Sequence, residues 1–480
     1  MKKTLVKILS AFLALTMLIP FAGCQNDTPK KPNSGIEDTD DKDKTKETEK
    51  EVAPDETKEG TVVKELTVES IYTAKSPTEP GQFDARYVSD KLTKAGKASV
   101  ERAKKHFFNM VAEEALLTYE MMIPSQLSYG NSARVAEVMR RSINGEKVTI
   151  GLLGDSIPAG AGASETSKTL GGQIIDFWND SFHPEGKEGN AEFVNASIGS
   201  NSLLNVCHRM DDDLLSHNPD LVVMTAWSTH DAVYDKAAFE SMIARMLDKG
   251  IAVIVCIVCD SMGKNNTVLF KEIAEGYSVP FISWAEAFEK NELMWSEFGS
   301  DSIHPNDRGH ASIAASVCLY LLSVAENLPE ISKKEAEMPA EEITKYGRLF
   351  TTATVYDRND ADKYTVENNG FSDKDYAASA FRTYNGWHSA SKGDTIVFTV
   401  TGIKSIMILF GHDTDLGRVT YSIQDVETGK RLGGATIDNN ASYSYTWNTG
   451  VARGLEGKTV KVTVKAVEGT VICGLMVTPE

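Results

Sequence analysis

Basic residues are scarce relative to acidic ones in this chain of 480 residues. Lysine and arginine together number 50 and aspartate and glutamate 68, so the formal net charge is -18 and the isoelectric point is near 5.1. Such a chain offers no basic stripe along which nucleic-acid phosphates would bind. The composition therefore excludes nucleic acid as an expected partner and is typical of a soluble exported protein.

Cysteine is also scarce, with six residues in the chain. One is Cys24, near the N-terminus, and the others are Cys207, Cys256, Cys259, Cys318 and Cys473. The five that follow Cys24 are an odd number, which does not form a disulfide framework. We therefore expect the fold to depend on its apolar core rather than on cross-links.

The apolar run near the N-terminus is short for a membrane span. Lys2, Lys3 and Lys7 precede the run ILSAFLALTMLIPFAG, and Cys24 follows it directly. This pattern is typical of a secretory signal. Phe21-Ala-Gly-Cys24 resembles a bacterial lipobox in which phenylalanine replaces the usual leucine. We predict a lipoprotein signal peptide over residues 1–24, lipid attachment at Cys24 and a membrane-anchored position at the cell surface or outside the cytoplasm. The alternative is an ordinary signal cut nearby, with Cys24 incidental.

Two segments separate this signal from the first apolar strand. Residues 25–80 carry Pro, Thr, Lys, Asp and Glu with almost no aliphatic periodicity, so they cannot bury enough apolar surface to offset chain ordering. We predict a disordered tether that charge repulsion extends. Residues 81–130 show helical spacing and good helix formers, and we predict a helical extension that packs against the next domain.

Apolar segments recur at regular intervals between Lys147 and Ala325. They read VTIGLL, FVNA, LVVMTA, IAVIVCIV and VPFIS, and each precedes a stretch with helical spacing. Continuous apolar strands separated by helices indicate a parallel sheet that is covered on both faces. We therefore predict an α/β domain over residues 131–330, with its ligand site at the carboxyl ends of the strands.

A serine and a histidine follow the first and last parts of this pattern. Ser156 ends VTIGLLGDS, where we expect a tight turn to open a helix and its backbone N–H to face developing negative charge. A serine needs a base, and His304 follows roughly 150 residues later, a separation at which both ends of one layer can meet. Asp301, three residues before His304, can orient the imidazole. The alternatives are a helix-capping Ser156 and a helix-capping Asp301.

These residues carry a resemblance to the SGNH/GDSL hydrolase superfamily, serine esterases with a flavodoxin-like three-layer fold. Gly154-Asp155-Ser156 resembles the first block, Asn195–Ser200 the second and Asp301-x-x-His304 the last. The resemblance implies Ser156 as nucleophile, His304 as base and Asp301 as its partner. It also implies deacylation by water, with neither a metal nor an organic cofactor.

The same resemblance implies an oxyanion hole. Its donors would be the backbone N–H groups of Ser156 and of Gly199, or of Ser200 if the register slips by one. The third block departs from the pattern, because the family's Gly-x-Asn-Asp is replaced by a segment that ends in His230-Asp231. His230 therefore occupies the position of the oxyanion asparagine.

One cluster of metal-ligand types lies between the second and third strands. His208, Asp211, Asp212, Asp213 and His217 all fall on an expected helix. A charged outer face is expected on such a helix, so we predict no metal site.

The composition changes after about Met338. Segments rich in β-branched residues alternate with Gly, Asp and Asn turns, which indicates an antiparallel, jelly-roll-like β-sandwich over residues 345–480. Such domains beside exported esterases resemble carbohydrate-binding modules. Tyr384, Trp387 and Trp447 are candidates for a sugar-stacking platform, and core or inter-domain packing is the alternative.

Together, these features predict an extracytoplasmic serine esterase that removes O-acyl groups, O-acetyl foremost, from carbohydrate or cell-wall glycan. Its partners would be the acylated carbohydrate or a small ester, and the membrane through the lipid anchor at Cys24. The alternatives are a lipase or thioesterase-like acylhydrolase with a longer acyl pocket, and a non-catalytic glycan-binding surface lipoprotein, which His230 makes credible.

Overall fold

The computed structural model describes residues 88–226, 232–379 and 382–480. These residues fall within one compact unit. The predicted signal peptide, Cys24 and the tether lie outside the described residues and stay predictions, as does the role of His230.

The first sheet has the strand order β1-β6-β5-β4-β2-β3. Its strands are β1 (Gln126–Ser128), β2 (Thr149–Leu153), β3 (Glu192–Asn195), β4 (Leu221–Ala226), β5 (Ala252–Ile257) and β6 (Phe281–Ser283). All neighbours pair in parallel except β1, which runs antiparallel to β6. The predicted α/β fold is confirmed, and β1 is an addition within a segment that was expected to be helical.

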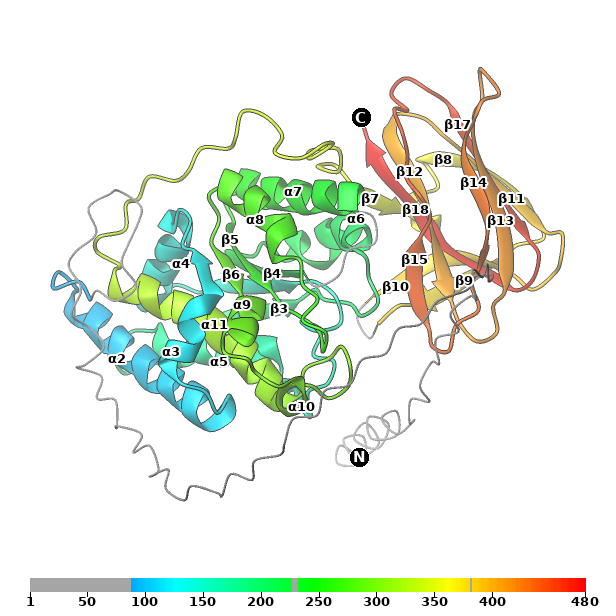
Figure 1. Cartoon of the computed structure of the whole chain (residues 1–480). Coiled ribbons are helices and arrows are strands. Elements are labelled where there is room, and N and C mark those ends of the chain that lie inside the picture. The colour runs from blue at the N-terminus through cyan, green and yellow to red at the C-terminus, as the bar shows by residue number, and fades with distance from the viewer. Residues whose placement is uncertain (1–87, 227–231, 380–381) are drawn as a thin grey trace, which may run out of the picture. The chain divides into compact units, whose positions relative to one another are not determined.

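Helices cover both faces of this sheet (Figure 1). They are α2 (Lys94–Asn109), the π-helical η2 (Met110–Glu114), α3 (Tyr119–Met122), η3 (Ile123–Ser125), α4 (Ala133–Ile143), η4 (Thr166–Lys168), α5 (Leu170–Ser181), α6 (Leu203–Asp213), η5 (Leu215–His217), α7 (Ala232–Asp248), α8 (Thr267–Gly276), α9 (Trp284–Lys290), α10 (Trp295–Phe298) and α11 (Asp307–Glu326). One face packs against α2, α4, α5 and α11, and the other against α6, α7 and α8. The result is a three-layer α/β arrangement.

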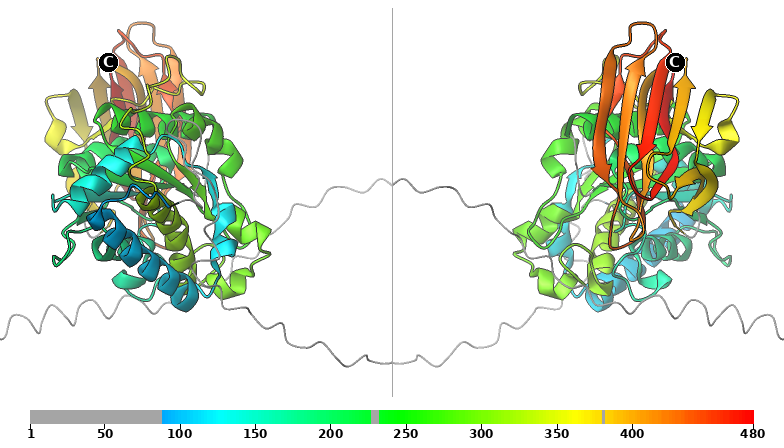
Figure 2. Two further views of the ribbon diagram at one scale, coloured as in Figure 1. Left: turned by 90° about the vertical axis from the view of Figure 1, so that its left-hand side faces the viewer. Right: turned by 90° about the vertical axis from the view of Figure 1, so that its right-hand side faces the viewer.

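The strands have the continuous apolar character that a doubly covered sheet requires. Every residue of β4 and of β5 is buried, and neighbouring residues point into opposite layers. In the first layer α2 and α11 lie side by side (Figure 2). Helix α11 is apolar enough over its length to cross a membrane, but its residues from Gly309 to Glu326 are all buried, as in the central helix of a packed layer.

The order of the strands places the functional edge. β2 lies between β3 and β4 in the sheet. The chain therefore runs from β2 to its neighbour β3 on one side, and then crosses back to β4 on the other side of β2. Ligands of open α/β sheets bind at such a switch point, outside the carboxyl ends of the strands. Ser156 follows β2 and Gly199 follows β3, which brings both to this point.

The C-terminal part is a β-sandwich, as predicted (Figure 1). Its strands are β7 (Thr354–Tyr356), β8 (Tyr364–Asn369), β9 (Ser372–Ala377), β10 (Thr383–Ser389), β11 (Thr395–Val400), β12 (Ile403–His412), β13 (Arg418–Asp425), β14 (Arg431–Asp438), β15 (Tyr445–Asn448), β16 (Ala452–Arg453), β17 (Val460–Ala466) and β18 (Thr470–Pro479). One sheet has the order β15-β12-β18-β10-β9, with β16 beside β12 and β7 beside β18, and the other has the order β14-β13-β17-β11-β8. The strands within each sheet pair in antiparallel fashion.

The outward face of the first of these sheets is apolar and covered. Met407, Leu409 and Met476 are at most 1% exposed. They belong to the same hydrophobic cluster as Phe239 and Met242 of α7. The sandwich therefore shares a core with the α/β layers, and burial of this apolar area stabilises their contact.

Candidate active site

Ser156, His304 and Asp301 form a connected chain of hydrogen bonds. The Oγ of Ser156 lies 3.1 Å from Nε2 of His304. The Nδ1 of the same ring lies 2.7 Å from Oδ2 of Asp301. The structure thus brings the three predicted residues together in the geometry of a serine, its base and the carboxylate that orients the base.

Ser156 lies in a turn after β2, and no helix begins at this residue. The backbone N–H of Ala161 donates to the carbonyl of Ser156, and the next α-helix begins only at Leu170, capped by Thr169. The expected helix at Ser156 was therefore wrong, because glycines at 160 and 162 with φ of +101° and +93° keep this segment in turns. Ser156 is consequently not a helix cap, and its hydroxyl contacts His304 instead.

The loop that carries Asp301 and His304 is held by hydrogen bonds near both of its ends. The N–H of Ser300 donates to the carbonyl of His304 at 2.8 Å, and the indole of Trp295 donates to the carbonyl of Asp301 at 2.6 Å. Asn306 caps α11 by accepting from Gly309. Since Asn306 takes the capping role, Asp301 remains available to His304.

Asp301 is held in its charged form. Burial acts to raise its pKa, but hydrogen bonds from the ring and backbone N–H of His304 and from the N–H of Ile303 hold that pKa below its ordinary value. A charged carboxylate at Nδ1 fixes the proton there and leaves Nε2 as the acceptor for the serine hydroxyl.

Two backbone N–H groups lie beside the nucleophile. A Cβ built on Gly199 would lie 3.6 Å from Cβ of Ser156, so the two residues are in contact distance. Among the described residues, none accepts a hydrogen bond from the N–H of Ser156 or of Gly199. The segment after Gly199 leads into α6, whose N-terminus is capped by Ser202 and favours negative charge. Neither N–H has an acceptor among the described residues, which is what an oxyanion donor requires.

Asp155 lies within the same turn. Its Oδ1 accepts from the N–H of Ile157 at 3.3 Å. Burial raises the pKa of Asp155 to about 6, while the hydrogen bond from the N–H of Ile157 and the nearby guanidinium of Arg209 act in the opposite direction. This carboxyl therefore changes charge near about pH 6, one residue before Ser156.

The loop that follows Ser156 is fastened to α11. His310 is fully buried; its Nδ1 accepts from the N–H of Leu170 at 3.2 Å, so Nε2 carries the proton and donates to the carbonyl of Ala161 at 3.0 Å. Burial lowers the pKa of His310, which keeps the ring neutral. His310 is thus a packed residue, and it fixes the turn that carries Ser156.

The sequence missed one residue of this site, Arg209 of α6. Its side chain is 0% exposed. Its guanidinium donates to the carbonyls of Ala196 and Gly154, which directly follow β3 and β2, and to Oδ1 of Asn201. In the sequence it lies in the run CHRMDDD, which was expected to be a charged outer face.

That expectation was wrong for His208 as well. The ring is 1% exposed, its Nδ1 donates to the carbonyl of Leu204, and it packs 5.5 Å from Phe350. Within the described ranges, no group of three His, Cys, Asp or Glu side chains is arranged to hold a metal ion.

The sugar-stacking interpretation needs correction for two of its three residues. Tyr384 and Trp387 are 1% and 4% exposed, and Trp387 packs 5.0 Å from Phe398 inside the sandwich. Buried rings offer no face to a sugar, so these two are packing residues. Trp447 is half-buried on β15, 6.4 Å from Tyr445.

Comparison with known proteins finds one matching family model and several solved structures of similar fold. Residues 152–312 match the model of the GDSL-like Lipase/Acylhydrolase family. A two-domain esterase (CEX) active on acetylated mannans is similar at 21% identity over 75% of this chain and 99% of its own, with a TM-score of 0.65. The same esterase co-crystallized with mannopentaose is similar at 20% identity over 75% of this chain and 98% of its own, with a TM-score of 0.64. An acetyl xylan esterase, AlAXEase, matches 35% of this chain and 98% of its own at 20% identity, with a TM-score of 0.31. No curated protein sequence matches the chain.

Proposed function

We propose that the protein, whose residues 152–312 match the GDSL-like Lipase/Acylhydrolase family, is a serine ester hydrolase that removes O-acetyl groups from carbohydrate outside the cytoplasm. The observation that carries the proposal is the hydrogen-bonded series Ser156, His304 and Asp301 beside two backbone N–H groups that have no acceptor among the described residues.

The first half of the reaction follows from this arrangement. Ser156 Oγ attacks the ester carbonyl while Nε2 of His304 takes its proton. The tetrahedral oxyanion is stabilised by the N–H groups of Ser156 and Gly199, and the imidazolium by Asp301. His304 then gives its proton to the departing sugar oxygen, which leaves an acyl group on Ser156.

The second half repeats these steps with water. His304 takes a proton from water, the hydroxide attacks the acyl carbonyl, and the same two N–H groups stabilise the second oxyanion. Collapse releases the carboxylic acid and returns the proton to Ser156. His230, in the position of the family's oxyanion asparagine, would be a third donor.

Carbohydrate as the substrate is supported by an aromatic residue next to the oxyanion loop. Ser200 follows Gly199, and its Oγ lies 3.1 Å from the hydroxyl of Tyr443. The Tyr443 side chain is 51% exposed and its ring lies 5.2 Å from that of Tyr445. Exposed aromatic faces suit the apolar faces of sugars. The two-domain relative that shares this fold is an esterase active on acetylated mannans.

The experiment compares acetylated polysaccharides with p-nitrophenyl esters of increasing chain length. We expect release of acetate from at least one acetylated mannan or xylan, and faster hydrolysis of the acetyl ester than of the octanoyl ester. The Ser156→Ala protein is the control for every substrate. Preference for the octanoyl ester would favour a lipase. Hydrolysis of the p-nitrophenyl esters alone, with no acetate released from any polysaccharide, would contradict carbohydrate as the substrate.

The place of action rests on the N-terminal sequence. We propose attachment to the membrane by a lipid on Cys24, with residues 25–80 as the tether. Radiolabelled palmitate should enter the protein and Cys24→Ala should abolish its incorporation. Equal membrane association of the Cys24→Ala protein would refute the anchor.

A further inference from the structure

One buried guanidinium holds together the two backbone segments that carry the oxyanion donors. Arg209 donates to the carbonyl of Gly154 at 3.1 Å, two residues before Ser156. It also donates to the carbonyl of Ala196, three residues before Gly199. The separation between the two donor N–H groups is therefore fixed by the position of Arg209.

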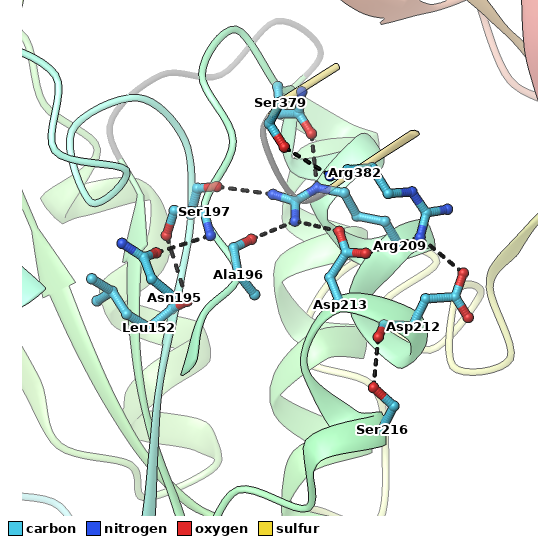
Figure 3. A network of polar contacts seen from close by, with 12 residues as sticks. Leu152, Asn195, Ala196, Ser197, Arg209, Asp212, Asp213, Ser216, Ser379 and Arg382 are labelled. Atoms are coloured by element: carbon cyan, nitrogen blue, oxygen red, sulfur yellow. Dashed lines mark hydrogen bonds and ion pairs between the residues drawn. The ribbon is translucent and has the colours of Figure 1, made fainter. Parts of the chain in front are cut away.

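Arg209 has a carboxylate partner, and that partner has a second arginine. Oδ2 of Asp213 lies 3.0 Å from Nη1 of Arg209. Oδ1 of the same carboxylate lies 2.8 Å from Nη1 of Arg382, which comes from the sandwich (Figure 3). Asp213 is 7% exposed at its side chain, and these two cations lie against its buried carboxylate.

Arg382 is itself held in place by its surroundings. Its guanidinium lies 4.6 Å from the centre of the Tyr384 ring and 3.0 Å from Oδ2 of Asp212. Its backbone N–H donates to Oγ of Ser379 at 3.0 Å (Figure 3). The planar group is thus stacked and doubly ion-paired, an arrangement that lysine does not reproduce.

We propose that Arg382 is a positioning residue for the reaction of Ser156, acting through Asp213 and Arg209 on the turn that carries the nucleophile. The inference rests on the proposed function and adds to it that Arg382, a residue of the sandwich, supports the chemical step without itself touching the substrate. Without Arg382, Asp213 keeps only one cation in a buried place, and the Asp213–Arg209 pair shifts to recover solvation. That shift moves the carbonyls of Gly154 and Ala196, and the donors with them.

The first test measures kcat and KM with p-nitrophenyl acetate, which has no sugar for the sandwich to bind. Arg382→Gln should lower kcat by about 10-fold or more with little change in KM, because small displacements at a reacting centre cost up to about 100-fold. Arg382→Lys should recover part of kcat, since it restores the charge but not the stack. Arg358→Gln is the matched control: its partners Asp373 and Asp375 lie within the sandwich, and kcat should stay at the wild-type value.

The second test follows hydrogen exchange of the backbone, which does not depend on catalysis. Peptides that cover residues 152–158 and 194–201 should exchange faster in Arg382→Gln than in the wild type, and at the wild-type rate in Arg358→Gln. If Arg382→Gln does not fold, the same comparison is made with Arg382→Lys. Unchanged exchange in these peptides would overturn the proposal, and so would a raised KM with unchanged kcat.

The two proposals can fail separately. A wild-type protein without hydrolysis, but with faster exchange in Arg382→Gln, would overturn the esterase function and leave the structural link through Asp213 and Arg209 intact. Hydrolysis by the wild type with unchanged kcat and exchange in Arg382→Gln would do the reverse.

Discussion

Asp155→Asn should make the protein more stable at neutral pH and leave its stability unchanged in acid. Folding raises the pKa of this carboxyl from 3.8 to about 6, because burial penalises the charged form. This difference in pKa between the unfolded and folded protein corresponds to about 3 kcal/mol of unfolding free energy. Because the side chain keeps part of its surface exposed, this value is an upper limit.

The sign follows from the raised pKa. The contribution of Asp155 to stability is fully present below the unfolded pKa of 3.8 and is lost as the pH rises through about 6. Asparagine keeps the oxygen that accepts from Ile157 but cannot ionise. We therefore expect equal stability of the two proteins near about pH 3.5 and an advantage of up to about 3 kcal/mol for Asp155→Asn near about pH 7.5.

Urea unfolding of both proteins at a series of pH values tests this expectation. Taking the difference between the two proteins at each pH removes the contribution of all other titrating groups. Asp248→Asn, at the exposed end of α7, is the control for an amide substitution on the surface. A difference that stays constant from acid to neutral pH would refute the reasoning from burial.

Four further substitutions test the site. Ser156→Ala should abolish hydrolysis of p-nitrophenyl acetate and leave thermal unfolding unchanged, because it removes only one hydroxyl. A residual rate above a few per cent of the wild-type rate would contradict this. In the same assay, the fold-loss in hydrolysis rate for Asp301→Asn should be roughly 10- to 100-fold smaller than that for Ser156→Ala. Equal losses would show that Asp301 does more than orient His304. Gly162→Ala should destabilise by at least about 1 kcal/mol in thermal unfolding, because φ is +93° and a Cβ would lie 2.1 Å from the carbonyl of Pro305; wild-type stability would show that the loop can move. If His230 donates to the oxyanion, His230→Ala should lower kcat by about 100-fold, with substantial recovery in His230→Asn; an unchanged pH–rate profile in His230→Ala would exclude that role.

The α/β layers were predictable because their signal is local and strong. β4 and β5 are unbroken apolar runs, and the structure gives β4 the bounds Leu221–Ala226, the same run LVVMTA that the sequence marks. β8 and β9 of the sandwich were not predictable in this way. Their residues are mostly polar and exposed, and they are strands because neighbouring strands supply backbone hydrogen bonds.

The residues of the site also differ in whether a local sequence signal reveals them. Ser156, His304 and Asp301 stand in short motifs whose chemistry can be recognised from the residue types. Arg209 and Arg382 lie in no such motif, because their partners are backbone carbonyls and a carboxylate that only the folded chain brings near. The burial of Tyr384 and Trp387 follows from the contact of the sandwich with the α/β layers and from its own core, which composition does not reveal.

Covalent labelling by a fluorophosphonate probe tests the central claim, an activated serine at residue 156, most directly. The probe reacts only when a base and an oxyanion hole assist the serine, as the contact of Ser156 with His304 at 3.1 Å provides. Peptide mapping should place the label on Ser156 in the folded wild-type protein, with none in Ser156→Ala and little in His304→Ala. A folded wild-type protein that stays unlabelled, or that carries the label on another serine, would contradict the assignment of Ser156 as the nucleophile.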